Sequence, residues 1–209
     1  MWSISLSTSN LVGYFTPLSS LTEMTTFQIN GNKISGTIPQ SFFDLPKMQY
    51  LDLNNNQLTG SIPPFTSLNT QLEYLLLNNN RLEGTIPESL SMLNIVYQLF
   101  LGRNSLVGTI PRFLGLLTSL DSLDLQNNLL TGTIPVLDQT SLCNVDFSVN
   151  YLTMGSLEEI PLSTFSTTAI DSNIALQSNC LVFRNFVKPS QNVDATHCRG
   201  VRVLPNPYF

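Results

Sequence analysis

The chain has 209 residues and a formal net charge of −5, and 42% of its residues are hydrophobic, which is enough for a sizeable core. Only 11% of the residues are charged, against about 25% in an ordinary soluble domain. There is no basic run suited to nucleic acid or to an anionic membrane surface. There is also no apolar run of the roughly 18 residues that a membrane span needs. The composition therefore argues against nucleic-acid binding and against a membrane span in this chain.

The first ten residues carry no charged n-region and no long apolar h-region, so they do not read as a signal peptide. Residues 4–15 already fit, with losses, the motif that dominates the rest of the chain, Ser9 taking the place of a recurring asparagine. We therefore expect a chain that is truncated at its amino terminus, or a fragment of a larger protein.

One motif then recurs at a period of 24 residues, and a last, incomplete copy spans residues 145–152. The close copies are FQINGNKISGTIP (27–39), LDLNNNQLTGSIP (51–63), LLLNNNRLEGTIP (75–87), LFLGRNSLVGTIP (99–111) and LDLQNNLLTGTIP (123–135). A fixed period in this range is typical of a solenoid, in which each repeat stacks on its neighbours. We expect about seven turns, with decayed copies at both ends.

Each recurring position has a structural role. Two apolar residues two apart, such as Leu51 and Leu53, point the same way from a short strand, so stacked copies form a parallel sheet. Gly60 allows a close backbone approach or a positive φ, and Pro63 ends the strand ladder. Asn56, which lies between the strand and Gly60, can pair with backbone groups that the turn leaves free. Stacked copies predict a structural asparagine ladder of Asn32, Asn56, Asn80, Asn104, Asn128 and Asn150.

Between one motif and the next, apolar residues recur three apart, as at Leu114, Leu117 and Leu120. This spacing suits short 3₁₀ segments on the return side of each turn.

These residues resemble the plant-type leucine-rich repeat, LxxLxxLxLxxNxLxGxIPxx, over roughly residues 4–155. The resemblance implies an α/β solenoid: a right-handed curved horseshoe with a parallel concave β-sheet, 3₁₀ or irregular convex turns, and a second short sheet near the Gly-x-Ile-Pro segment. Known members include ectodomains of receptor-like kinases, receptor-like proteins and polygalacturonase-inhibiting proteins. The resemblance therefore implies a fold and a broad role rather than a particular partner.

We expect two parts in the chain. Residues 1–155 form the array of about seven repeats of 22–24 residues, and residues 156–209, which leave the period, form a carboxy-terminal capping segment and tail, because the end of a solenoid exposes its core. Cys180 and Cys198 lie outside the repeats and are a plausible disulfide in a secreted chain. Cys143 falls near the last strand and reads as a small buried residue. The alternative is that all three are reduced thiols in an intracellular protein.

The sequence indicates no catalytic site, no metal and no cofactor. His197, the one histidine, is adjacent to Cys198, and neighbouring residues rarely face each other as a nucleophile and base need to. A zinc site would need about four ligands, and this part of the chain offers only Cys180, His197 and Cys198, which are poorly spaced. Asp124 and Asp146 occupy the same place in neighbouring repeats, so they could hold a cation or share a proton, although a solvated polar face is the interpretation that we favour.

Binding is expected on the concave face, in the columns of outward-pointing strand residues. Stacking places aromatic and leucine side chains from neighbouring repeats side by side, with acidic residues on either side and arginines where the strands end. Such an exposed cluster is typical of an interface hot spot; the alternative is that it only stabilises cross-strand neighbours. The candidate ligand-binding residues are Tyr50, Asp52, Tyr74, Leu76, Phe100, Arg103, Asp124 and Asp146.

The function that we predict is a non-catalytic recognition module that binds a protein or peptide, or a glycan stacked on the tyrosines. The alternatives are an inhibitor of a secreted hydrolase, by resemblance to the polygalacturonase-inhibiting proteins, and a structural or adhesion protein of the cell surface. An extracellular or cell-surface location fits the repeat type and the cysteines. The absence of an Asn-x-Ser/Thr glycosylation site from the sequence counts slightly against it.

Overall fold

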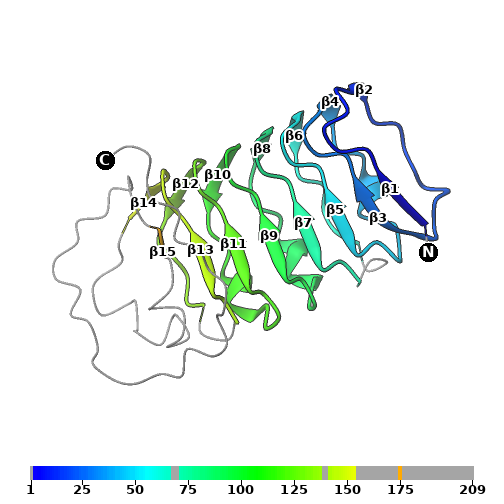
Figure 1. The fold of residues 1–209 in the computed structure, drawn as a ribbon. Helices are drawn as coiled ribbons and strands as arrows, with labels where there is room; N and C mark the ends of the chain where they lie inside the picture. Colours follow the sequence, from blue (N-terminus) through cyan, green and yellow to red (C-terminus); the bar gives the residue numbers. More distant parts are fainter. Residues whose placement is uncertain (1, 67–70, 138–140, 154–173, 176–209) are drawn as a thin grey trace.

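A computed structural model describes residues 2–66, 71–137 and 141–153 and the backbone of residues 174–175. The chain winds as a solenoid of about seven turns. Its strands join two parallel sheets alternately along the chain, so that a turn adds one strand to each sheet (Figure 1). The eight-stranded main sheet has the order β1 (Trp2–Ser5), β3 (Met24–Gln28), β5 (Tyr50–Asp52), β7 (Tyr74–Leu76), β9 (Gln98–Phe100), β11 (Ser122–Asp124), β13 (Asn144–Asp146) and β15 (Ile174–Ala175). The predicted parallel sheet is thereby confirmed.

The second sheet has seven strands, and most of them overlap the predicted glycine-containing segment of each repeat. Its strands are β2 (Val12–Tyr14), β4 (Lys33–Thr37), β6 (Gln57–Ser61), β8 (Arg81–Gly84), β10 (Ser105–Thr109), β12 (Leu129–Gly132) and β14 (Tyr151–Leu152). The repeat glycine has a positive φ, as at Gly60 (φ 75°), where a Cβ would lie 2.9 Å from Cγ2 of Thr37. Glycine is needed there both for the backbone conformation and for the close approach of the preceding turn.

The return side of three turns carries short 3₁₀ helices: η1 (Gln40–Phe42), η2 (Glu88–Met92) and η3 (Arg112–Leu116). The apolar residues spaced by threes, Leu114, Leu117 and Leu120 among them, are buried in one continuous core with the strand leucines. The prediction of 3₁₀ segments from this spacing is confirmed.

The asparagine ladder is also confirmed, and Asn56 shows its geometry. Its Oδ1 accepts a hydrogen bond from the backbone N–H of Ile34 at 3.0 Å, in the preceding turn. Its Nδ2 donates to the carbonyl oxygens of Ile29 in the preceding turn and Leu53 in its own turn, both at 3.1 Å. Each asparagine thus joins two turns through backbone groups that the bend would otherwise leave unpaired.

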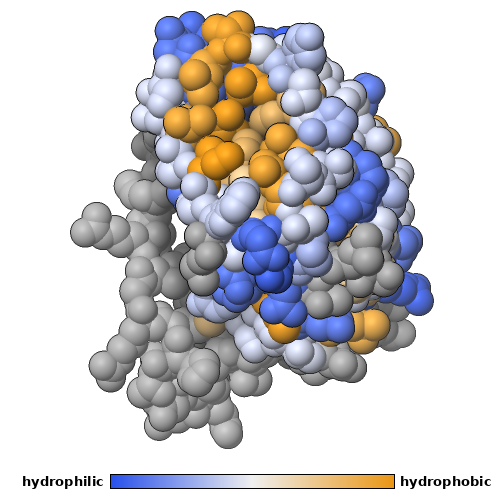
Figure 2. Space-filling view, turned by 90° about the vertical axis from the view of Figure 1, so that its right-hand side faces the viewer, coloured by the Kyte–Doolittle hydropathy of each residue, from blue (hydrophilic) through white to orange (hydrophobic). Residues whose placement is uncertain are grey.

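Apolar side chains gather at the amino-terminal end of the solenoid, which faces the viewer in Figure 2. Trp2, Val12 and Tyr14 are more than half exposed there, because β1 and β2 are edge strands with a neighbour on one side only. The two sheets otherwise stack every turn on the next, so that the side chains described below are held on a regular scaffold.

At the other end, the main sheet gains β15 from a segment that the repeat pattern had not placed in the array, with Val145 paired to Ile174. The rest of the predicted capping segment lies outside the described residues. Cys143, expected to be a small buried residue, is buried but also takes part in a disulfide bond. The predicted bond between Cys180 and Cys198 lies outside the described residues too, and in a chain with three cysteines a bond at Cys143 competes with it for the same sulfur atoms.

Candidate ligand-binding surface on the concave face

The outward side of the main sheet, which we call the concave face, carries the predicted columns of side chains in register. The strand pairing aligns Tyr50 with Tyr74, and Asp52 with Leu76. It continues from Leu76 to Phe100 and from Phe100 to Asp124, and the next pair of strands aligns Asp124 with Asp146. The strand register is therefore as predicted, and it is kept even where the last turn is two residues shorter than the 24-residue period.

Three tyrosines form a row across neighbouring strands, which we call the tyrosine row: Tyr50, Tyr74 and Tyr97. The ring centroids of Tyr50 and Tyr74 are 5.0 Å apart, and those of Tyr74 and Tyr97 are 5.9 Å apart. Aromatic pairs at such distances attract each other beyond their area of contact. The row combines a rigid apolar surface with three phenol groups.

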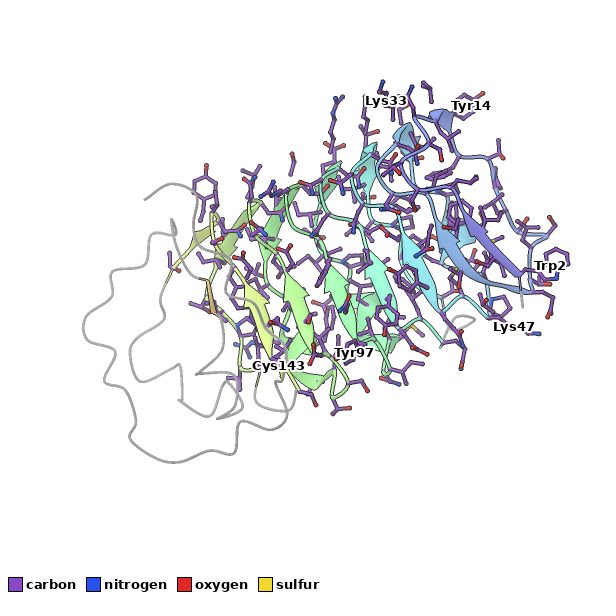
Figure 3. The ribbon with its side chains drawn as sticks, viewed as in Figure 1. Trp2, Tyr14, Lys33, Lys47, Tyr97 and Cys143 are labelled. Atoms are coloured by element: carbon purple, nitrogen blue, oxygen red, sulfur yellow. The ribbon has the colours of Figure 1, made fainter. Side chains whose placement is uncertain are left out.

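Tyr97 was not among the predicted site residues, because it precedes β9 by one residue and the motif assigns that position to a turn. It is 42% exposed, and Figure 3 labels it at the lower edge of the main sheet. One sequence signal could have found it. The residue before each of the four central strands β5, β7, β9 and β11 is polar or aromatic rather than aliphatic, at Gln49, Glu73, Tyr97 and Asp121.

The expectation that Leu76 and Asp52 face solvent freely is wrong, since each is only 6% exposed. Both point outward, but Leu76 lies between Asp52 and Phe100 in its column. Neighbouring strands are separated by only about 4.8 Å, so large side chains in one column cover each other. Tyr50, Tyr74 and Phe100 are half-buried for the same reason, and the surface is a packed layer rather than a set of protruding rings.

Asp52 is a carboxylate in poor contact with water at one end of the tyrosine row. Its Oδ1 accepts a hydrogen bond from the backbone N–H of Asn54 at 3.1 Å. Burial raises the pKa of Asp52 above its ordinary value, and the hydrogen bond from Asn54 offsets part of the effect. Burial likewise raises the pKa of Tyr50, and the nearby Asp52 charge adds to it.

Asp121 lies at the opposite end of the row. Its charge raises the pKa of the Tyr97 phenol, and so does the hydrogen bond that it accepts from the Tyr97 hydroxyl. Its Oδ2 also accepts a hydrogen bond from the Ser122 hydroxyl at 2.7 Å. The tyrosine row is therefore flanked by one carboxylate at each end.

Asp124 accepts hydrogen bonds from two residues that lie just after strands of the main sheet, and one of these residues is two turns away. Asn78 Nδ2 donates to its Oδ2 at 2.7 Å, and the backbone N–H of Gln126 donates to its Oδ1 at 3.0 Å. The bond to Asn78 skips one turn of the solenoid, because Gly102 stands between them without a side chain; a Cβ at Gly102 would collide with the Asp124 carboxylate. The repeat pattern did not predict this link, since it treats Gly102 as one more turn residue.

The pairing of Asp124 with Asp146 is as predicted, but their environments differ. Burial raises the pKa of Asp124, and the neighbouring Asp146 contributes a smaller increase, while hydrogen bonds from Gln126 and Asn78 lower it. Asp146 accepts a hydrogen bond from the Ser148 N–H at 2.8 Å. Within the described ranges, no three His, Cys, Asp or Glu side chains come together as metal ligands, so the cation hypothesis stays without support.

Arg103 is exposed at the rim of the concave face and adopts a left-handed backbone conformation, with φ 54°. Asparagine occupies the same place in three other turns, at Asn55, Asn79 and Asn127, and Val149 occupies it in a fourth. Asparagine tolerates this conformation, whereas most side chains are strained by about 1–2 kcal/mol. Arg103 thus occupies a position where asparagine would be less strained.

We expect Arg103→Asn to raise the free energy of unfolding by about 0.5–1 kcal/mol, because it relieves this strain. The measurement is the midpoint of urea unfolding at an unchanged slope. Val149→Asn is the matched variant away from the candidate site, and it should stabilise at least as much, since a β-branched residue is disfavoured most at positive φ. A stabilisation by Val149→Asn without one by Arg103→Asn would contradict the strain argument at Arg103.

Comparison with known proteins agrees with the geometry. Models of the leucine-rich repeat family match residues 4–60, 46–93 and 119–138. Among solved structures, the chain is similar to a pollen receptor kinase 3, with 34% identity and a TM-score of 0.66, over 74% of this chain and 76% of that one. No curated protein sequence gives a significant match. The chain belongs to the leucine-rich repeat family, in its plant-type form.

Two further similar structures are of longer receptors in complex with peptides. The plant peptide hormone receptor RGFR1 in complex with RGF2 matches at 29% identity and a TM-score of 0.74, over 86% of this chain and 28% of that one. The ectodomain of the Arabidopsis receptor kinase HAESA, in complex with an IDA peptide hormone ligand, matches at 29% identity and a TM-score of 0.62, over 81% and 32%. This chain therefore spans about a third or less of these receptor chains.

Leucine-rich repeat ectodomains of this kind are generally non-catalytic ligand-binding modules, and those of the similar receptor kinases are extracellular. Across the described part of this chain, no helix has the length and apolar character that crossing a bilayer would require. His197, considered above, lies outside the described residues.

Proposed function

We propose that this chain is a non-catalytic, extracellular recognition module that binds a peptide ligand on its concave face. The observation that supports this most is the tyrosine row with Phe100 and Leu76 beside it. These side chains form a packed apolar layer on the outward face of a sheet, where a soluble protein ordinarily places polar residues. The similar receptor structures that contain peptide hormones support the same class of ligand.

The arrangement suits a peptide better than a small molecule. The surface extends over several neighbouring strands and has polar groups at its edges, such as Asp121 and Arg103. An extended peptide can lie across the strands and bury apolar side chains against the tyrosines. Rigid aromatic anchors with polar groups around them are the usual composition of a binding hot spot.

The test is capture of ligands from an extracellular extract of the source organism, comparing the wild type with the double variant Tyr74→Ala/Phe100→Ala. The control is Leu116→Ala/Tyr151→Ala, which removes two exposed apolar side chains of the convex side and of the second sheet. We expect the wild type and the control to retain the same peptide, and the concave variant to lose it, at equal melting temperatures. Equal retention by all three proteins would place the site elsewhere.

The hydrolase-inhibitor alternative has a different outcome in the same experiment. If the captured molecule is an intact secreted hydrolase whose activity falls on binding, the peptide proposal is wrong and the inhibitor alternative replaces it.

A further inference from the structure

The charges of the concave face are unevenly distributed. Of the nine described Asp and Glu residues, five lie in the outward columns of the main sheet or directly before its strands: Asp52, Glu73, Asp121, Asp124 and Asp146. Of the five described Lys and Arg residues, only Arg103 lies there, at the rim. Figure 3 labels Lys33 at the opposite, upper edge of the molecule.

The acids at the ends of the tyrosine row have no basic partner in the described part of the chain. The one described ion pair joins Lys47 to Glu23 at 2.6 Å. Lys47 is the described basic residue nearest in sequence to Tyr50, and its partner is therefore Glu23. Asp52 and Asp121 are instead paired with neutral donors, the N–H of Asn54 and the hydroxyls of Tyr97 and Ser122. A carboxylate without a counter-charge next to an aromatic surface is complementary to a cation, and Asp52 is in addition largely removed from water.

We propose that the ligand seated on the tyrosine row is an extended peptide with two basic residues, Lys or Arg, about five positions apart. This rests on the proposed function. One basic side chain pairs with Asp52 beside Tyr50, and the other pairs with Asp121 beside Tyr97. The aliphatic stems of both lie on the tyrosine faces, where a cation is attracted by the ring as well as by the carboxylate.

The spacing follows from the strand order. Asp52 is on β5 and Asp121 directly precedes β11, with β7 and β9 between them. Three strand spacings of about 4.8 Å separate the two acids by roughly 14 Å across the sheet. Asp121 aligns with Gln49, three positions before Asp52, which adds about 10 Å along the strand direction. The two acids are therefore about 17 Å apart. An extended peptide advances about 3.3–3.6 Å per residue, so about five residues cover this span. The raised pKa of Asp52 agrees with a carboxylate that lacks a positive neighbour in the free protein.

The experiment selects a random peptide library on the purified chain and then measures the affinity of an enriched peptide for defined variants. Asp52→Asn/Asp121→Asn removes both charges with almost no change of shape, and the asparagine oxygen can still accept from Asn54 N–H. Glu83→Gln/Glu88→Gln is the matched control, since it removes the same net charge from exposed residues on β8 and η2. A peptide of the same composition with its two basic residues adjacent tests the spacing.

We expect enrichment of peptides with two basic residues about five apart. Their affinity should fall about tenfold or more for the Asp52→Asn/Asp121→Asn variant, stay unchanged for the control, and weaken for the peptide with adjacent basic residues. Enriched peptides that lack basic residues and lose binding only with Tyr74→Ala/Phe100→Ala would overturn this inference and leave the proposed function standing. No enrichment, or binding that none of the concave variants affects, would overturn both.

Discussion

Asn128→Ala is expected to lower the free energy of unfolding by about 3–5 kcal/mol, because several buried backbone groups lose their partner at once and each costs about 1–3 kcal/mol. Asn128 is 4% exposed. Its Oδ1 accepts from the Leu106 N–H at 3.0 Å, and its Nδ2 donates to the carbonyl oxygens of Leu101 and Leu125, both at 3.1 Å. Urea unfolding followed by circular dichroism measures the loss.

Two further variants test the cause of this loss. Asn94→Ala removes an exposed asparagine from the turn before β9 and should change stability by less than about 0.5 kcal/mol. Asn128→Asp keeps the acceptor oxygen but removes the donor and buries a charge, so it should destabilise at least as much as Asn128→Ala at neutral pH. A loss for Asn128→Ala no larger than that for Asn94→Ala would mean that the ladder does not join the turns energetically.

Most of the fold could be predicted because the repeat period determines which residues stack. Once five asparagines stand 24 residues apart, the partners of Asn56 or Asn128 follow from the geometry of a stacked turn. The columns of the concave face follow as well, and Asp124 faces Asp146 as expected. Hydrophobic periodicity alone also predicted the 3₁₀ segments, since residues three apart share one side of such a helix.

What the sequence pattern did not predict depends on contacts between side chains of particular sizes. The burial of Leu76 depends on how Asp52 and Phe100 fill the space on either side of it. The position of Tyr97 depends on which way a residue turns at the start of a strand, which a two-residue alternation does not determine. The bond between Asn78 and Asp124 depends on a side chain that Gly102 does not have. These contacts are particular to individual repeats and are not encoded in the motif that all repeats share.

The same distinction explains why the candidate site is harder to predict than the scaffold. The motif fixes the buried positions, so the outward positions are free to differ from one repeat to the next. Asp52, Leu76, Phe100 and Asp124 occupy equivalent places but differ in charge and shape. Specificity in such a protein is a feature of the differences among repeats, and these differences must be examined residue by residue in the structure.

Gly115→Ala is expected to destabilise the protein by about 3 kcal/mol or more, through overpacking. Gly115 is buried in η3 and does not belong to the recurring glycines of the motif. A Cβ there would fall on the carbonyl oxygen of Val136, and would lie 3.1 Å from the carbonyl carbon of that residue and 3.4 Å from Cα of Leu137. These are backbone atoms of the next turn, which cannot rotate away as a side chain can.

The reason for the close approach is the length of that next turn. The ladder residues Asn128 and Asn150 are 22 residues apart, whereas the preceding ones are 24 apart. A turn that is two residues shorter has less chain for its return side and passes closer to η3. Leu116→Ala, at a 64% exposed neighbouring position, is the control and should change stability by less than about 0.5 kcal/mol. If Gly115→Ala unfolds at the same urea concentration as Leu116→Ala, the short turn must be able to move away, and the solenoid is less rigid at its carboxy-terminal end than its packing indicates.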